Sequence, residues 1–368
     1  MQATVFRSTD LTRSDSAWQN LFREFWPAYK NWFVSKKGAL INMTELKLAQ
    51  QKFAEHMPEL WPTYQKLVKL ADNDPTAAQF LTMYRPPAYL INCSQAVLTD
   101  DAPILMRNYD LSPDLSENTV SMSNWLGQKV IATNECLWGV DDGMNEAGLA
   151  VSLTFGGSQT VGDGFGIPII ITYILHTCTS TAQAIEVLRR IPTHMAYNVT
   201  MVDKTGAHAT VMVAPNQAAQ VTTQRAITNH QAQVTWAAQA SFSKTVERKD
   251  FLDEFLAQPR TRDELLDAFL TAPLRSTNFA AHFGTVFTAV YQPLSGEMTY
   301  AWPNQRWTHR FEDFKNDSIS VQLDGETSTD WASITDWVAF GEQMWRKWVY
   351  PTVQAAAQFQ RLPRSIHH

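Results

Sequence analysis

The stretch GMNEAGLAV, from Gly143 to Val151, decides the fold of this chain. Two glycines bracket a polar turn, and the apolar run that follows continues to Phe155. Glycine adopts backbone conformations that other residues avoid, so this bracket predicts a tight turn. The β-favouring residues after it predict a strand over 149–155, which places the turn at the end of a β-sheet.

Fifty residues upstream of Gly143, polar residues interrupt an otherwise apolar segment. Cys93 follows Asn92, and Arg107 and Asp110 stand three residues apart. Residues 89–98 and 104–109 alternate like strands on either side of a polar turn, which predicts a β-hairpin. This hairpin brings Arg107 and Asp110 back toward Cys93, so one pocket can hold a thiol, a guanidinium and a carboxylate.

Two interpretations of Cys93 follow from these residues alone. A lone cysteine in an apolar strand is usually a small buried hydrophobe, and an Arg and an Asp beside a turn are often a structural ion pair. A thiol is a good nucleophile only as the thiolate, and its free pKa is about 8.5. The second interpretation is therefore that Cys93 is a nucleophile. The polar residues around Cys93 favour it, whereas no similar residues surround Cys136 or Cys178.

The ordered set of motifs resembles the peptidase C45 family, the acyl-coenzyme A:6-aminopenicillanate acyltransferase-like members of the N-terminal-nucleophile (Ntn) hydrolase superfamily. Other segments along the chain are similar to one bacterial branch of this family: 26–29, 32–33, 163–168 and 285–293. The resemblance implies an α+β fold, the αββα sandwich of two stacked antiparallel sheets with helices on both outer faces. It also implies a cysteine that becomes a new chain N-terminus by self-cleavage and then attacks amide or thioester carbonyls.

Carried over from the family, the nucleophile is Cys93, and cleavage falls between Asn92 and Cys93. The freed α-amine has a pKa of about 7.7–8.0, so it can take the thiol proton near neutral pH. Asp110 would orient the ammonium form. Arg107 would pair with that carboxylate and favour the thiolate by its charge.

The resemblance also supplies groups that stabilise the tetrahedral intermediate. Asn198 is expected to donate its side-chain amide to the oxyanion, and a backbone N–H at Thr154 or Phe155 is expected to be the second donor. Arg248 resembles the arginine that supports the nucleophile in this superfamily. With its basic neighbours it could equally form a solvated helix face.

Two alternatives remain open. The family carries Gly where this chain has Asn92, which favours an Ntn-fold protein that stays uncleaved and acts as a non-catalytic binding or structural protein. The other is an ordinary cysteine hydrolase in which His230, in the turn Thr228-Asn229-His230, serves as the base without cleavage.

The chain is expected to divide into a helical N-terminal segment (1–92, a candidate propeptide), a catalytic core (93–330) and a helical tail (331–368). The tail, rich in tryptophan, is interpreted as a packing or subunit-contact helix, which leaves a homo-oligomer open. Pro27 is expected to bend or break a first helix, and Pro58 a second. Further elements are expected as strands at 120–126, 129–138, 197–202, 209–213, 285–291 and 298–302, and helices at 168–178, 181–190, 243–257 and 262–271.

Composition narrows the class of protein. Of 368 residues, 45% are hydrophobic and 18% charged, which is typical of a globular chain. The net charge of −6 favours neither nucleic acid nor an anionic membrane. No apolar run reaches the roughly 18 residues of a membrane span. Three cysteines without a CxxC motif favour a reducing compartment, so we expect a cytoplasmic protein.

The ligands expected from the sequence are small molecules. No metal or organic cofactor is predicted, because the chain has no HExxH, GxGxxG or P-loop motif and no clustered metal ligands. With 13 Trp and 19 Phe, the chain suggests a small-molecule amide or acyl substrate with an apolar or aromatic acyl group.

Overall fold

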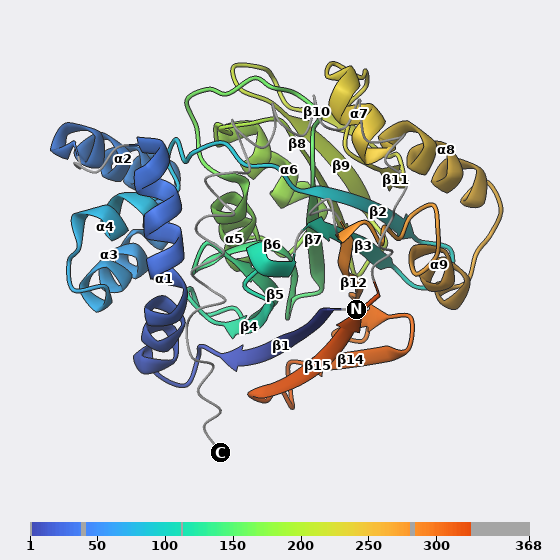
Figure 1. Cartoon of the computed structure of the whole chain (residues 1–368), viewed down its shortest axis with the longest axis horizontal. Helices are drawn as coiled ribbons and strands as arrows, with labels where there is room; N and C mark the ends of the chain where they lie inside the picture. Colours follow the sequence, from blue (N-terminus) through green and yellow to red (C-terminus); the bar gives the residue numbers. More distant parts are fainter. Residues whose placement is uncertain (1, 38–41, 112, 280–283, 325–368) are drawn as a thin grey trace.

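Two stacked β-sheets form the centre of the computed structural model, which describes residues 2–37, 42–111, 113–279 and 284–324 (Figure 1). One sheet has nine strands in the order β10-β9-β8-β7-β6-β5-β4-β1-β15, and the other has six in the order β11-β2-β3-β12-β13-β14. The strands of the larger sheet are β1 (Gln2–Asp10), β4 (Thr119–Ser123), β5 (Val130–Glu135), β6 (Gly139–Asn145), β7 (Leu149–Phe155), β8 (Tyr197–Asp203), β9 (His208–Val213), β10 (Gln220–Thr222) and β15 (Asp317–Leu323). Those of the smaller sheet are β2 (Asn92–Leu98), β3 (Ile104–Leu111), β11 (Ala226–Ile227), β12 (Gly284–Gln292), β13 (Glu297–Trp302) and β14 (Gln305–Arg310).

Helices cover the outer faces of both sheets. On the nine-stranded sheet α5 and α6 pack against β5–β9, and on the six-stranded sheet α7–α9 lie over β2, β3 and β11, while β2 and β3 face β7 and β8 between the sheets. This is the expected αββα sandwich. These five helices are α5 (Ile167–Thr177), α6 (Thr181–Arg190), α7 (Ala237–Ser243), α8 (Thr245–Phe255) and α9 (Arg262–Phe269).

The N-terminal helices gather at the side of the sandwich opposite α7–α9 (Figure 1). They are α1 (Asp15–Lys37), α2 (Met43–His56), α3 (Trp61–Leu70) and α4 (Pro75–Leu81), with the short 3₁₀ turn η1 (Pro58–Leu60) between α2 and α3. A second 3₁₀ turn, η2 (Pro113–Leu115), lies between β3 and β4. Two tryptophans tie them to the larger sheet: Trp18 donates its indole N–H to the carbonyl of Leu137, and Trp138 donates to that of Leu81. Pro58 falls in η1, so the expected break after α2 is confirmed.

The GMNEAGLAV stretch forms the turn between β6 and β7, as expected. Gly148 has φ of +86°, a conformation that other residues adopt only at a cost. A Cβ at Gly143 would lie 2.6 Å from that of Ala132 on β5, so glycine lets the strands pack closely here. Asn145 donates its amide to the carbonyls of Leu175 and Cys178, which fixes the end of α5 against the turn. The motif is therefore structural, and it holds the larger sheet and its helix in register.

The N-terminal segment contains a strand that the sequence did not predict. β1 lies inside the nine-stranded sheet, parallel to β4 and antiparallel to β15. Its Phe6 is buried against Phe287 and Trp302. Residues 1–92 are therefore not only helical, because they also supply one strand of the sheet core.

The expected break at Pro27 is wrong, since α1 runs unbroken from Asp15 to Lys37. Pro27 lies on the exposed side of the helix, while Trp26 and Ala28 on either side of it are buried. Proline removes one backbone hydrogen bond, but the carbonyl freed at exposed Arg23 can bind water. Packing of the buried face then keeps the helix continuous.

The strand expected over 129–138 is present as β5 but ends earlier, at Glu135, because the chain turns at Cys136 and Leu137 before β6. Both turn residues have positive φ, 56° and 74°, although neither is glycine. The turn therefore carries none of the usual sequence signals. The interpretation of 331–368 as a helical tail concerns residues outside those that the structure describes.

Candidate active site

Cys93 lies at the start of β2 and is 0% exposed. Arg107 donates from Nη2 to its sulfur over 3.1 Å. The main-chain N–H of Cys93 donates to Asn229 Oδ1 at 3.1 Å, and its carbonyl accepts from Arg248 Nη1 at 3.0 Å. Three polar side chains therefore contact Cys93, one at its sulfur, one at its N–H and one at its carbonyl. A cysteine that only fills a hydrophobic core does not have such surroundings.

Burial raises the pKa of the Cys93 thiol to about 12, against the lowering effect of the Arg107 guanidinium. The thiol is therefore protonated at neutral pH in the uncut chain. A base close to the sulfur is needed before it can act as a nucleophile.

Arg107 and Asp110 do not pair with each other, contrary to expectation. Successive side chains of a strand point to opposite faces, so residues three apart on β3 lie on different sides of the sheet. Arg107 faces the interior, where Nη1 lies 3.1 Å from Asp142 and Nη2 lies 3.9 Å from Asp141. Asp110 lies on the helix-covered side, 3.3 Å from Arg248, and accepts from Thr285 Oγ1 at 2.6 Å.

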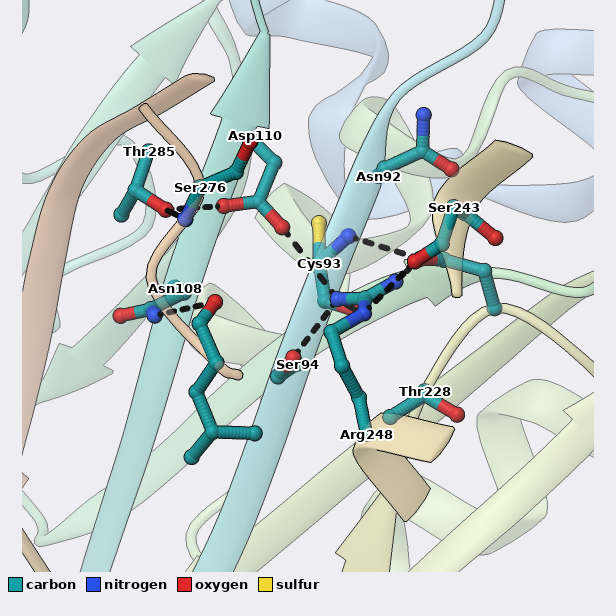
Figure 2. A network of polar contacts seen from close by, with 12 residues as sticks. Asn92, Cys93, Ser94, Asn108, Asp110, Thr228, Ser243, Arg248, Ser276 and Thr285 are labelled. Carbon is teal, nitrogen blue, oxygen red and sulfur yellow. Dashed lines mark hydrogen bonds and ion pairs between the residues drawn. The ribbon is translucent and has the colours of Figure 1, made fainter. Parts of the chain in front are cut away.

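Arg248 reaches from α8 to the start of β2 and holds the site together (Figure 2). Besides the carbonyl of Cys93, Nη1 donates to Ser94 Oγ at 2.7 Å, and Nη2 donates to Asn229 Oδ1 at 2.7 Å. Its Nε donates to the carbonyl of Ser243. At 3% exposure, Arg248 is not part of a solvated helix face. Its guanidinium is instead buried against the main-chain carbonyl of Cys93.

Asn198 and Thr154 are register partners on β8 and β7, and both are fully buried. Asn198 donates its amide to the carbonyls of Thr228 and His230 and to Thr154 Oγ1, and Thr154 donates to the carbonyl of Thr228. The amide hydrogens of Asn198 are therefore already used. Both side chains brace the 228–230 loop, one step away from Cys93.

Asn229, in that braced loop, is the residue that the sequence did not single out. Its Oδ1 accepts from the N–H of Cys93, while its buried Nδ2 has no hydrogen-bond partner among the described residues. A free buried donor beside a thiol can stabilise a developing oxyanion. The turn Thr228-Asn229-His230 drew attention only to its histidine, although an Asn after a short strand could also have been noticed.

His230 does not lie in contact with Cys93 in the part of the chain described. Its Nδ1 pairs with Thr245 Oγ1 at 2.9 Å, and burial lowers its pKa. The geometry gives no support to a Cys93–His230 pair.

Next to Tyr109, Tyr29 of α1 joins the buried carboxyl of Glu117 and the partly buried carboxyl of Glu135. Its hydroxyl oxygen lies 2.7 Å from Glu117 Oε1 and 2.6 Å from Glu135 Oε1. One phenolic proton cannot serve both. Glu117 also accepts from the N–H of Leu137 and the amide of Asn134, as a carboxylate would. Burial and nearby Asp141 raise the pKa of Glu135 well above its usual range, which favours a proton on Glu135 in its contact with Tyr29.

This cluster is connected to the thiol through Tyr109. Its hydroxyl donates to Glu135 Oε2 at 3.3 Å, and its ring lies 4.8 Å from the Arg107 guanidinium. Burial raises the pKa of Asp141 to about 7, against the lowering effect of Arg107. Helix α1 is thus linked to the residues that hold Arg107 beside Cys93.

Replacing Tyr29 by phenylalanine should lower the free energy of unfolding by about 1–3 kcal/mol, because the carboxyls of Glu117 and Glu135 and the N–H of Cys136 lose a partner. Urea unfolding at pH 7 measures the change. A matched Tyr64→Phe variant, which loses one bond to a backbone carbonyl and one to Gln50, should lose less. If both variants lost the same free energy of unfolding, Tyr29 would not join the carboxyls of Glu117 and Glu135 as described.

All three cysteines are free, and no described helix is long and apolar enough to cross a membrane. Within the same residues no cluster of His, Cys, Asp and Glu has the arrangement of a metal site.

Comparisons with solved structures find weak similarity in overall shape. A variant of conjugated bile acid hydrolase from Clostridium perfringens is 12% identical, with a TM-score of 0.46, and the alignment covers 65% of this chain and 100% of that one. Penicillin V acylase from Agrobacterium tumefaciens is 13% identical, with a TM-score of 0.41 and coverage of 60% and 86%. The Caenorhabditis elegans ortholog of N-acylethanolamine-hydrolyzing acid amidase is 15% identical, with a TM-score of 0.36 and coverage of 55% and 93%.

No curated protein matches the sequence. The sequence model of one family, described as acyl-coenzyme A:6-aminopenicillanic acid acyl-transferase, matches residues 97–307. The match covers more than half of the chain and begins four residues after Cys93. This protein therefore belongs to the acyl-coenzyme A:6-aminopenicillanic acid acyl-transferase family, and it is an enzyme of the hydrolase or acyltransferase type.

Proposed function

We propose that this protein is a self-processing cysteine Ntn enzyme that cleaves or forms linear amide C–N bonds through a thioester on Cys93. One observation carries the proposal. A single residue presents its sulfur to a guanidinium at 3.1 Å and its main-chain nitrogen to the Asn229 amide oxygen at 3.1 Å. Those are the surroundings that a thiol and a free α-amine on one residue would need.

In the self-cleavage step, the Cys93 sulfur attacks the carbonyl carbon of Asn92. The C–N bond breaks, the thiol proton passes to the nitrogen of Cys93, and a thioester joins the two segments. Water then hydrolyses that thioester, leaving a carboxylate on Asn92 and a free thiol. The nitrogen, now an amine, remains beside Asn229 Oδ1.

In turnover, the α-amine of Cys93 takes the thiol proton, and the sulfur attacks the substrate carbonyl. Asn229 Nδ2 is placed to donate to the oxyanion, and a backbone N–H near Thr154 is the proposed second donor. Arg107 favours the thiolate by its charge. The protonated amine then supplies the leaving amine with its proton, and water or an acceptor amine releases the acyl group.

The expected ion pair at Asp110 is replaced in this scheme by one with Arg248. Asp110 acts on the site through that arginine, which holds the carbonyl of Cys93 and the amide of Asn229. Asn198 and Thr154 hold the loop that carries Asn229. Both therefore act as positioning residues in the proposed reaction, in addition to any donor at the backbone of Thr154.

An apolar or aromatic acyl group fits the surroundings of the segment that ends at the scissile bond. In that segment Tyr89 packs 6.4 Å, centroid to centroid, from both Trp32 and Tyr197. Tyr197 in turn lies 6.4 Å from Phe155, on the strand that follows the GMNEAGLAV turn. A small, partly open apolar hollow adjoins Tyr89 and Trp32. The three free cysteines support the cytoplasm as the proposed location.

Intact-mass measurement of the purified protein tests the self-cleavage. We expect two species, residues 1–92 and a second chain that begins with Cys93. A single species of 41.6 kDa after prolonged incubation would contradict cleavage. The Cys93→Ala variant is the control and should remain one chain. The proposal divides the protein into the segment 1–92, a core over 93–330 and the remaining tail.

The second candidate is a protein that stays uncut and binds without turnover. It is favoured by Asn92, whose branched side chain narrows the conformations available at the scissile bond, and by the raised pKa of the Cys93 thiol. Acylation of Cys93 by an amide substrate followed by release of the acyl group would exclude it.

A further inference from the structure

Gln239 on α7 makes direct contact with the side chain that precedes the nucleophile. Its Nε2 donates to Asn92 Oδ1 at 2.9 Å, and Gln239 is 2% exposed. Gln239 Oε1 is also buried, and it has no hydrogen-bond partner among the described residues. A buried acceptor without a partner costs free energy, so this oxygen would gain from a ligand that supplies an N–H or O–H.

Neighbouring groups hold Gln239 in this position. Ser243, one turn further along α7, donates its hydroxyl to the main-chain carbonyl of Gln239 and accepts from Nε2 at 3.3 Å. The carbonyl of Ser243 in turn accepts from Arg248, the residue that fixes the backbone of Cys93. The Gln239 amide is therefore fixed relative to the nucleophile, as a group that distinguishes ligands must be.

The same sulfur attacks two carbonyls in the proposed function, on which this inference rests. In self-cleavage the carbonyl belongs to Asn92, and in turnover it belongs to the substrate. Because the sulfur and the oxyanion donors stay where they are, the acyl side of a substrate occupies the space that Asn92 leaves. The contacts made to Asn92 in the uncut chain therefore describe the site next to the reacting carbonyl.

We propose that Gln239 is a specificity-determining residue that selects acyl groups in which the carbon next to the reacting carbonyl carries a side chain ending in a carboxamide, or in another group that both donates and accepts. Its Nε2 would donate to the ligand oxygen, as it does to Asn92, and its Oε1 would accept from the ligand N–H. Peptide-like acyl groups that end in asparagine or glutamine have this chemistry. An acyl group that is apolar at this position would leave Oε1 without a partner and Nε2 with only its 3.3 Å bond to Ser243 Oγ.

The test uses the full chain and three substrates with the same leaving group, the 7-amino-4-methylcoumarin amides of N-acetyl-asparagine, N-acetyl-leucine and N-acetyl-aspartate. Leucine matches asparagine in size and lacks its polar atoms. For the wild type we expect kcat/KM for the asparaginyl amide to exceed that for the leucyl amide by about 10- to 100-fold, the range for a buried hydrogen-bonding site left unpaired. The aspartyl amide should also be poor, because its carboxylate has no N–H for Oε1.

In Gln239→Met, which keeps the length of the side chain, the asparaginyl-to-leucyl ratio should fall close to one. Gln239→Glu keeps the shape and the acceptor but loses the donor, so it should also lower the ratio, and it serves if the methionine variant does not fold. Gln183→Met, on exposed α6 over the other sheet, is the matched control and should keep the wild-type ratio.

The outcomes separate the inference from the function on which it rests. Hydrolysis of the asparaginyl and leucyl amides at similar rates, or a preference that persists in both Gln239 variants, would overturn the role of Gln239 and leave the thioester mechanism in place. Failure to hydrolyse any of the three amides, together with no acylation of Cys93 by them, would overturn the proposed function and the inference together.

Discussion

Replacing Cys93 by alanine should abolish self-cleavage and lower amide turnover by about 10⁴-fold or more, the scale seen when an enzyme loses its nucleophile. The variant keeps the Cys93 main-chain contacts to Asn229 and Arg248, so the loss should come from the sulfur and not from the fold. Intact mass reports the cleavage, and release of amine from an amide substrate reports the turnover.

Cys178→Ala is the matched control for that experiment. Cys178 is buried at the end of α5, and its sulfur contacts only the Thr177 hydroxyl among the hydrogen bonds described. This variant should cleave itself and turn over substrate like the wild type. If Cys93→Ala were still cleaved after Asn92, or kept a tenth of the activity, the thioester mechanism would be wrong.

The second large effect is expected from Arg248→Met, which should lower the free energy of unfolding by about 3–5 kcal/mol, the cost of leaving one partner of a buried ion pair without the other. Among the described residues, Asp110 would then be a buried carboxyl that keeps its hydrogen bond from Thr285 and loses its ion pair. Burial already raises the pKa of Asp110, against the lowering effect of Arg248. Without Arg248, Asp110 should take up a proton at higher pH. Chemical unfolding and turnover, both followed across pH, measure the two effects.

A second substitution separates the charge of Arg248 from its packing. Arg248→Met combined with Asp110→Asn removes the unpaired carboxylate and should recover part of the lost stability, without restoring the activity. Lys249→Met provides the control, because its ion pair with Asp253 is exposed and worth about 0–1 kcal/mol. If Arg248→Met cost no more than Lys249→Met, Arg248 would not hold the site together.

Local signals in the sequence predicted most of the fold. The β2–β3 hairpin formed where alternation and a polar turn placed it. Helix α9 begins at Arg262, where the sequence predicted a helix, because the Thr261–Glu264 capping box supplies two local hydrogen bonds. The family resemblance supplied the layered arrangement, and the family itself is confirmed by the match over 97–307.

Features that depend on distant partners could not be predicted. β1 is a strand because β4 and β15 flank it, and β15 lies more than 300 residues away in the sequence. Pro27 remains in a helix because of what its neighbours pack against. These are properties of the assembled core, and a window of sequence does not contain them.

In the candidate site, too, contacts between neighbouring strands were predicted, and those that depend on distant residues were not. The sequence brought Cys93 and Arg107 together, and their contact at 3.1 Å agrees with it. The prediction paired Arg107 with Asp110 because the two residues are close together along one strand. Side chains three residues apart on a strand point to opposite faces of the sheet, so these two do not meet. Asn229 was missed because its value comes from a loop braced by Asn198 and Thr154 on two strands. The catalytic roles of these residues remain predictions.

The position of β1 has a consequence for the products of the proposed self-cleavage. A segment released by cleavage after residue 92 could in general dissociate from the protein. Here the segment contains β1, which forms backbone hydrogen bonds with β4 on one side and β15 on the other. Removing this segment would leave a gap between β4 and β15 in the nine-stranded sheet, and β15 would lose the strand with which it pairs. The severed piece should therefore persist as a permanent second chain of the working enzyme, and a gene fragment beginning at the nucleophile should not yield a folded substitute.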